Sequence, residues 1–203
     1  QDGGYGWWEN DQTDLFMTAW VAEGLGEAAA AGVEVDPELL TRTLDALIHL
    51  LEAENVPPDV AAYALHAAAL NGRPQASMLD AAKAGIDRLS SIGVAHLLLA
   101  AVESKKADVV AAAKAALLSE RHLSRAADGS AHFNGLDERY HSKVEATAVA
   151  MRALVAAGET GPIIDDAAAG LMADFEDQRF GTTRETSLAV RALLAQLKRA
   201  PVG

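Results

Sequence analysis

The sequence predicts an all-α fold in which helical hairpins form a layered array, with one ring of helices inside and another outside. Three observations carry this prediction. Half of the residues are hydrophobic, mainly Ala and Leu, and only 5% are aromatic, which is typical of closely packed helices. One helical segment recurs along the chain. The links between successive helical patterns are short, so neighbouring helices are expected to be antiparallel.

The recurring segment indicates that one structural unit is used repeatedly to build a common core. Its copies are Thr13–Leu25, Ser142–Leu154 and Thr182–Leu193. In each copy a threonine is followed by Ala or Ser, then an apolar residue, with Leu seven positions after the threonine. The three threonines are Thr18, Thr147 and Thr186.

The first six helices are delimited by capping residues and stop signals. Asp11 or Thr13 caps the first helix, and Gly32 ends it. Asp36, followed by a proline, opens the second helix, which stops before the next Pro-Pro pair. Asn71, followed by glycine, closes the third. The expected ranges are 11–31, 36–56, 59–70, 77–89, 92–102 and 107–118.

The last three helices follow a long irregular stretch, residues 120–141, in which we expect turns and essentially no sheet. Ser142 with Glu145 and Thr182 with Glu185 have the spacing of capping boxes. The expected ranges of these helices are 142–158, 163–177 and 182–199, which brings the total to about nine.

Charge and composition exclude several classes of partner. The net charge of −12 argues against nucleic acid and anionic membranes as partners. The absence of cysteine removes disulfides, thiolate metal ligands and a cysteine nucleophile. There is no apolar run long enough to insert into a membrane and no signal peptide. Because the chain starts within a motif, we expect it to be a segment of a longer precursor.

Acidic residues and histidines give no specific catalytic motif. We expect Glu23, Asp45, Glu52, Glu54 and Asp108 to lie on solvated helix faces. The adjacent Asp165 and Asp166 favour a helix N-terminus over acid catalysis or Mg²⁺ binding. His49, His66 and His96 are interpreted as helix-packing residues, whereas solvated loop positions are favoured over a metal site for His122, His132 and His141. The sequence therefore predicts no catalytic, cofactor-binding or metal-binding residue and no cofactor.

The aromatic residues near the N-terminus allow two interpretations. Tyr5, Trp7 and Trp8 lie in a glycine-rich stretch, and we favour packing against the end of the helical array. The alternative is an edge that binds a saccharide or peptide together with the 120–141 loop. The candidate residues of that edge are Tyr5, Trp7, Trp8, His132 and Phe133.

Four stretches of the chain resemble the thioester domain of the α2-macroglobulin and complement family, most closely its bacterial members. They are QDGGYGWW with the following TDLFMTAWVAEGLGEA, PPDVAAYALHAAALNGR, SKVEATAVAMRALV, and RFGTTRETSLAVRALL, in which Phe180 replaces the usual Trp. Their order and spacing are similar to those of the family from Gln1 to about Lys198. The resemblance implies an α/α toroid of antiparallel helical hairpins in two concentric layers, with residues 1–203 forming a single domain or fragment that is incomplete.

The resemblance also implies a function without catalysis by this chain. The family's Cys-x-Glu-Gln thioester lies in the N-terminal part of the domain, which is missing here, and complement proteins carry a reactive His where residues 7–10 have none. We expect a non-enzymatic structural and protein-interaction module of a bacterial, extracytoplasmic α2-macroglobulin-like protease inhibitor. Its expected partners are the other domains of the parent chain and, through them, proteases. An incomplete ring is also expected to expose an apolar edge on its first helices, and therefore either to self-associate or to be marginally stable.

Two enzymatic alternatives share the toroid fold. A terpenoid cyclase of this type needs an Asp-rich motif such as DxDD, which is lacking. A prenyltransferase needs a zinc site that uses cysteine. These alternatives and the saccharide- or peptide-binding toroid remain as rival hypotheses.

Overall fold

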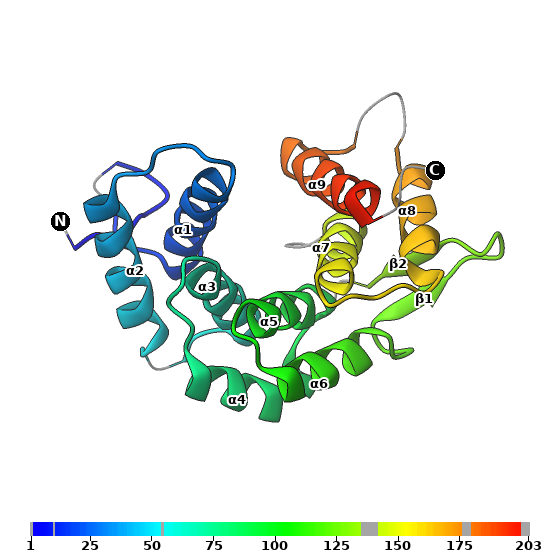
Figure 1. Ribbon diagram of the computed structural model, residues 1–203, viewed down its shortest axis with the longest axis horizontal. Helices are drawn as coiled ribbons and strands as arrows, with labels where there is room; N and C mark the ends of the chain where they lie inside the picture. Colours follow the sequence, from blue (N-terminus) through cyan, green and yellow to red (C-terminus); the bar gives the residue numbers. More distant parts are fainter. Residues whose placement is uncertain (1, 10, 54, 135–141, 176–179, 200–203) are drawn as a thin grey trace.

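The computed structural model describes residues 2–9, 11–53, 55–134, 142–175 and 180–199, and these form an open ring of helices (Figure 1). Contacts run in order through the inner helices α1 (Leu15–Ala30), α3 (Pro58–Leu70), α5 (Ser91–Glu103), α7 (Lys143–Ala156) and α9 (Thr183–Arg199). The outer helices are α2 (Pro37–Leu51), α4 (Ala76–Ala84), α6 (Ala107–Leu117) and α8 (Ile163–Ala173). The predicted all-α toroid is thus confirmed over the described part of the chain.

The central inner helices α3 and α5 have few polar residues because neighbouring helices cover them on both sides. In α5, eleven consecutive residues from Ser91 to Ala101 are buried. Leu97 and Leu98 have no exposed surface, and burial of each such side chain contributes roughly 2–3 kcal/mol. The many alanines of α3 and α5 let these helices approach closely. A layered ring of this kind therefore needs Ala and Leu more than it needs amphipathic periodicity.

Several predicted caps are confirmed by hydrogen bonds. Asp36 accepts a hydrogen bond from Glu38 N at 2.9 Å at the start of α2. In the second capping box, Glu185 N donates to Thr182 Oγ1 at 3.0 Å and Thr182 N donates to Glu185 Oε2 at 2.6 Å. Glu145 N likewise donates to Ser142 Oγ at 3.1 Å. These local signals fix where α2, α7 and α9 begin.

The predicted cap of α1 was wrong. Asp14 caps this helix, accepting a hydrogen bond from Met17 N at 2.9 Å. Because α1 begins at Leu15, the N-cap position is Asp14, whereas the Thr13 hydroxyl donates to Asp2 and the Asp11 carboxylate accepts from the next backbone N–H. Three predicted helix ends were also too long, and one of them is that of α2, which ends at Leu51, well before the Pro-Pro pair. Helix α4 ends at Ala84 before a 3₁₀ turn at Ile86–Arg88, and α8 ends at Ala173.

The prediction of essentially no sheet is confirmed over the described residues apart from one short hairpin, which was not predicted. Strands β1 (Leu123–Arg125) and β2 (Ala131–Phe133) form an antiparallel hairpin with Leu123 opposite Phe133. Gly129 allows the turn with φ +88°, and Asp128 accepts a hydrogen bond from Ser130 N at 2.9 Å. Burial of the β2 side chains against α7 and α8 stabilises a hairpin that is too short to be stable alone. The rest of the 120–141 stretch, from 135 to 141, lies outside the described residues.

The recurring threonines have a structural role in two of their three copies. Thr18 Oγ1 accepts a hydrogen bond from Tyr5 N at 3.0 Å, and Thr147 Oγ1 accepts one from Phe133 N at 3.0 Å. Both threonines are fully buried. In each case the inner helix fixes the backbone of the segment that precedes it. Thr186 differs because, among the described residues, no preceding segment donates to its hydroxyl, which itself donates to Thr182 O just before α9.

Helix length and hydropathy bear on the predicted absence of membrane insertion. Among the described residues, none of the helices combines the length and apolarity that crossing a bilayer requires.

Candidate functional site in the ring centre

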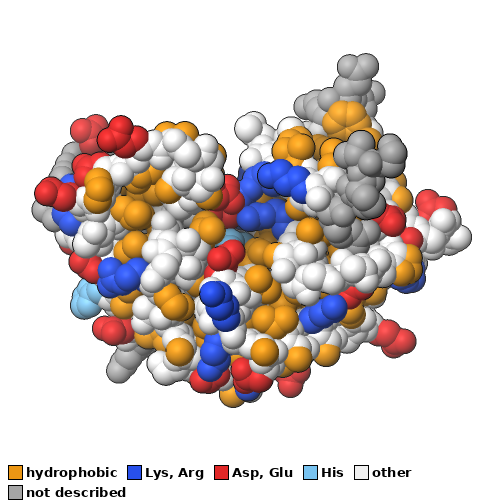
Figure 2. All heavy atoms as spheres, viewed as in Figure 1, with side chains coloured by type: hydrophobic (Ala, Val, Ile, Leu, Met, Phe, Trp, Pro, Cys, Tyr) orange, Lys and Arg blue, Asp and Glu red, His pale blue; other side chains and the backbone are white. Residues whose placement is uncertain are grey.

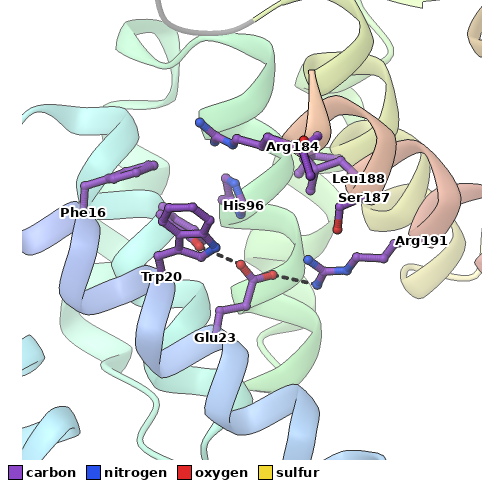
Figure 3. A pocket seen from close by; sticks show the side chains of 11 residues that line it. Phe16, Trp20, Glu23, His96, Arg184, Ser187, Leu188 and Arg191 are labelled. Carbon is purple, nitrogen blue, oxygen red and sulfur yellow. Dashed lines mark hydrogen bonds and ion pairs between the residues drawn. The ribbon is translucent and has the colours of Figure 1, made fainter. Parts of the chain in front are cut away.

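Glu23 lies at the centre of the ring and is only 6% exposed, so the prediction of a solvated position was wrong for this residue. Helix α1 directs its carboxylate toward α3 and α9 (Figure 3). Tyr63 Oη donates to Glu23 Oε2 at 2.6 Å, and Arg191 Nη2 donates to Glu23 Oε1 at 2.9 Å. Both carboxylate oxygens are therefore engaged by side chains from other inner helices.

A second arginine and a second glutamate extend this contact into a network. Arg152 Nη1 of α7 lies 3.5 Å from Glu23 Oε1, and its Nη2 lies 3.2 Å from Glu27 Oε1. Arg191 also forms an ion pair with Glu27. The network contains two arginines and two glutamates, so its formal charges balance. The network joins α1, on one side of the opening of the ring, to α7 and α9 on the other side.

The electrostatic environment keeps Glu23 ionised. Burial alone would raise its pKa, but the positive charges of His66, Arg191 and His96 and the hydrogen bond from Tyr63 lower the pKa to about 2. Burial raises the pKa of Tyr63, and the adjacent Glu23 charge raises it further. At neutral pH the pair consists of a carboxylate and a neutral phenol. Such a carboxylate is a weak base and has no proton to donate.

Two of the three helix histidines pack within this centre, as predicted. His66 is 1% exposed and His96 is 7% exposed, with their ring centroids 5.5 Å apart. Burial lowers the pKa of His66 to about 4, although the Glu23 charge opposes this shift. His66 Nδ1 has no hydrogen-bond partner among the described residues. The prediction of a packing role was wrong for His49, which is exposed on α2.

Beside Glu23 is a pocket with a volume of about 420 Å³ that opens between α1 and α9. In the view of Figure 2, basic side chains gather on the α9 side of the notch between these two helices. The pocket is lined by side chains of all five inner helices: Phe16, Trp20 and Glu23 of α1, Tyr63 of α3, His96 of α5, Val149 of α7, and Thr183, Arg184, Ser187, Leu188 and Arg191 of α9.

The residues of the predicted binding edge are not brought together. Tyr5, Trp7 and Trp8 precede α1, whereas His132 and Phe133 belong to β2 at the opposite end of the arc (Figure 1). The prediction was wrong for Phe133, which is fully buried and offers no ring surface to a ligand. The favoured packing role of the tryptophans was wrong for Trp8, which is 81% exposed. Trp7 is 57% exposed and stacks on Phe16 with centroids 6.2 Å apart.

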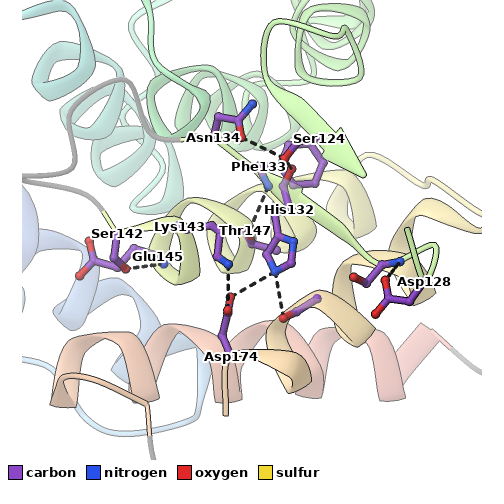
Figure 4. Close-up of polar contacts among 12 residues, drawn as sticks. Ser124, Asp128, His132, Phe133, Asn134, Ser142, Lys143, Glu145, Thr147 and Asp174 are labelled. Carbon is purple, nitrogen blue, oxygen red and sulfur yellow. Dashed lines mark hydrogen bonds and ion pairs between the residues drawn. The ribbon is translucent and has the colours of Figure 1, made fainter. Parts of the chain in front are cut away.

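The loop histidines are held by neighbouring residues, so the prediction of solvated positions was wrong for His122 and His132. His122 is 2% exposed, and its Nδ1 lies 3.1 Å from Ser91 Oγ. His132 Nε2 lies 3.1 Å from Gly170 O and 3.2 Å from Asp174 Oδ2, and the other oxygen of Asp174, Oδ1, pairs with Lys143 Nζ at 2.9 Å (Figure 4). His141 is outside the described residues. Within the described ranges, no group of three or more His, Asp or Glu side chains is placed to hold a metal ion.

The remaining acidic candidates agree with their predicted positions. Asp165 and Asp166 lie in the first turn of α8, and Arg125 pairs with Asp166 at 2.6 Å. Asp45, Glu52 and Asp108 are exposed, and Glu54 lies outside the described residues. Sequence reasoning missed Glu23, Arg152 and Arg191 as a cluster. The one available signal was a pair of acids four residues apart, Glu23 and Glu27, on an otherwise apolar helix.

Comparisons with known proteins point to one group by its fold. No protein-family model and no curated protein matches the sequence. Among solved structures, Salmonella α2-macroglobulin reacted with methylamine matches all of this chain with a TM-score of 0.76 at 19% identity, over 13% of its own length. Native Escherichia coli α2-macroglobulin, spanning domain MG7 to the C-terminus, matches 98% of this chain with a TM-score of 0.76 at 18% identity.

These matches establish a shared fold. Trypsin-activated α2-macroglobulin from Escherichia coli gives a TM-score of 0.74 at 18% identity over 98% of this chain. The chain spans only 13 to 32% of the length of the three proteins. The expected resemblance to bacterial α2-macroglobulins is therefore confirmed at the level of the fold, for one part of those proteins.

Proposed function

We propose that this chain is a non-enzymatic interaction module of a bacterial macroglobulin-like protease inhibitor that acts outside the cytoplasm. The observation that carries the proposal is the likeness of the whole chain to part of bacterial α2-macroglobulins, with TM-scores of 0.70 to 0.76 in six structures. The partners are the other domains of the parent protein and, through them, proteases. The negative charge of the chain supports protein partners over nucleic acid.

The chemistry of the ring centre supports a structural role over catalysis. Glu23 is the most deeply buried carboxylate of the pocket, and its oxygens are engaged by Tyr63 and Arg191. With its pKa near 2 it is neither an acid nor an effective base at neutral pH. Because the chain has no cysteine, it cannot itself form the family's thioester. Its contribution to inhibition is therefore to pack against and position the other domains.

The test is a protease-trapping assay with the natural protein that carries this chain. Trypsin is incubated with that protein, and its activity is then measured on a small chromogenic peptide and on casein. We expect the small substrate to be cleaved and casein to be protected, whereas the 203-residue chain alone protects neither. Unprotected casein would refute the inhibitor role. Turnover of a prenyl diphosphate by the chain would instead support the enzymatic alternative.

The exposure of Trp8 favours one second candidate, an aromatic platform for a saccharide or peptide. Trp7 and Trp8 border an open cavity of about 1040 Å³ that also includes Glu9, Asp11 and Gln12. Rings flanked by carboxylate and amide groups suit the apolar and hydroxyl faces of a sugar. Saturable quenching of tryptophan fluorescence by an oligosaccharide, lost in Trp8→Ala and kept in Trp20→Phe, is the expected result. A linear response would remove this candidate.

A further inference from the structure

The pocket in the ring centre has an apolar wall made of aromatic rings. Phe16 lies 5.5 Å from Tyr63 and 6.4 Å from Trp20, measured between ring centroids, and Tyr63 lies 4.5 Å from His96. Leu188 faces this wall from α9. A volume of about 420 Å³ is within the range of about 300–1,000 Å³ that is typical of small-molecule sites. The pocket therefore suits a flat apolar body.

Arg184 supplies a polar group at the same pocket. Its Nε lies 3.4 Å from Glu145 Oε1, its one ion pair among the described residues, and its guanidinium lies 5.4 Å from the centroid of the Phe16 ring. The side chain is 37% exposed and lines the pocket (Figure 3). Its two terminal nitrogens thus have no hydrogen-bond acceptor among the described residues. Two such nitrogens match the two oxygens of a carboxylate or sulfonate.

We propose that this pocket binds a small organic anion with a single carboxylate or sulfonate group and a flat aromatic body. Arg184 holds the anionic group through two parallel hydrogen bonds. The aromatic body lies against Phe16, Trp20 and Tyr63. The hydroxyls of Thr183 and Ser187 lie in the same pocket and are further donors to the anionic group.

The charges of the other lining residues favour this ligand class over its rivals. Arg191 is engaged by Glu23 and Glu27, so it neutralises the buried carboxylate that would otherwise repel an anion. A cationic ligand would meet Arg184 and Arg191 and find both oxygens of Glu23 already bonded. A polyphosphate would meet one available guanidinium, where it needs several. A single anionic group on an apolar body matches both parts of the pocket.

The test compares two dyes with nearly the same ring system. 8-Anilinonaphthalene-1-sulfonate carries one anionic group, and N-phenyl-1-naphthylamine carries none. Fluorescence titration of the 203-residue chain is expected to give saturable binding of the sulfonate at one site. Arg184→Gln should weaken the affinity for the sulfonate by roughly tenfold or more, because the charged hydrogen bonds are lost. The affinity for the neutral dye should fall by less than about threefold.

Controls locate the dye and separate binding from misfolding. Arg73→Gln changes an exposed ion pair with Asp45 and should leave both affinities unchanged. In a Trp7→Phe/Trp8→Phe variant, Trp20 is the remaining tryptophan, and it should be quenched as the sulfonate binds. Circular dichroism checks that each variant is folded. Equal affinity for the sulfonate with and without Arg184 would overturn the proposal, and so would an equal loss of affinity for both dyes. Loss of binding in Leu194→Ser, at an exposed residue that does not line the pocket, would also overturn it.

Discussion

At the scale of single residues, Glu23 is the position at which the structure is most sensitive to charge. Its carboxylate accepts hydrogen bonds from Tyr63 and Arg191, and its Oε1 lies 3.5 Å from the buried Nη1 atom of Arg152. A buried ion pair of this kind contributes little compared with an apolar replacement, but removal of one partner leaves the other charge without compensation. The network is therefore costly to break by a single substitution.

Glu23→Gln should lower the free energy of unfolding by about 3 kcal/mol, because the partly buried Arg152 and Arg191 lose one of their two counter-charges. For a chain of this length that corresponds to a fall of roughly 6–12 °C in the thermal midpoint. Asp45→Asn is the matched control, since Asp45 pairs with Arg73 at the surface, and it should cost less than about 1 kcal/mol. Thermal unfolding followed by circular dichroism measures both. Equal effects of the two substitutions would show that the network is not stabilising.

The second residue-scale prediction concerns His66 and pH. Its pKa is lowered from 6.5 to about 4 in the folded chain, so between these values the unfolded chain binds a proton that the folded chain does not. Stability should therefore fall as the pH drops from 6.5 to 4, by about 3 kcal/mol from this residue. Glu23, with its pKa lowered from 4.5 to about 2, adds a further loss between pH 4.5 and 2.

Urea unfolding at a series of pH values checks this assignment. His66→Gln should remove most of the slope between pH 6.5 and 4. Part of the slope should remain, because burial also lowers the pKa of His122. His49→Gln, at an exposed position of α2, is the control for the replacement of a histidine by glutamine. An unchanged slope in the His66 variant would mean that this histidine is protonated in the folded chain.

At the scale of elements, the contact between α8 and the β-hairpin depends on Gly170. A Cβ atom built there would lie 2.2 Å from Ala131 O and 3.1 Å from His132 Nε2. Because Ala131 O belongs to the backbone of β2, the clash cannot be relieved by a side-chain rotation. The glycine thus lets the helix and the strand approach closely enough for His132 to reach Gly170 O.

Gly170→Ala should destabilise the chain by about 1–3 kcal/mol, since it forces the hairpin away from α8. Gly24→Ala is the matched helical substitution, because nothing lies within 4 Å of a Cβ at that position. It should stabilise the chain by about 0.5–1 kcal/mol through the lower flexibility of the unfolded state. Opposite signs in chemical denaturation are expected. If Gly170→Ala leaves the free energy of unfolding unchanged, the hairpin can move away from α8 without cost.

The elements also show which parts of the fold follow from local sequence. Capping boxes act over a few residues, and the starts of α7 and α9 were predicted from them. The β-hairpin was missed because its strands have three residues each and depend on burial against α7 and α8. The central site was missed for a similar reason. Arg191 reaches Glu23 across 168 positions of sequence, and only the curvature of the ring brings them together.

At the scale of the whole molecule, the described chain is an arc whose first and last inner helices both carry exposed apolar side chains. On α9, Val190, Leu194 and Leu197 are 46%, 50% and 65% exposed and are spaced by four and three residues, which places them on one face. On α1, Trp20 is 49% exposed. The sequence predicted an apolar edge on the first helices, and the structure adds a second one on the last.

The α9 stripe leads to a prediction about self-association of the isolated chain. We expect light scattering after gel filtration to show a mass that rises with protein concentration, because the stripe has no cover within the described chain. Added salt should strengthen the association, since the net charge of −12 repels a second copy. Leu194→Glu/Leu197→Glu should give a monomer. Val33→Glu is the control, because it removes an isolated exposed side chain and should not change the mass. If the unmodified chain is a monomer at every concentration, the prediction is contradicted.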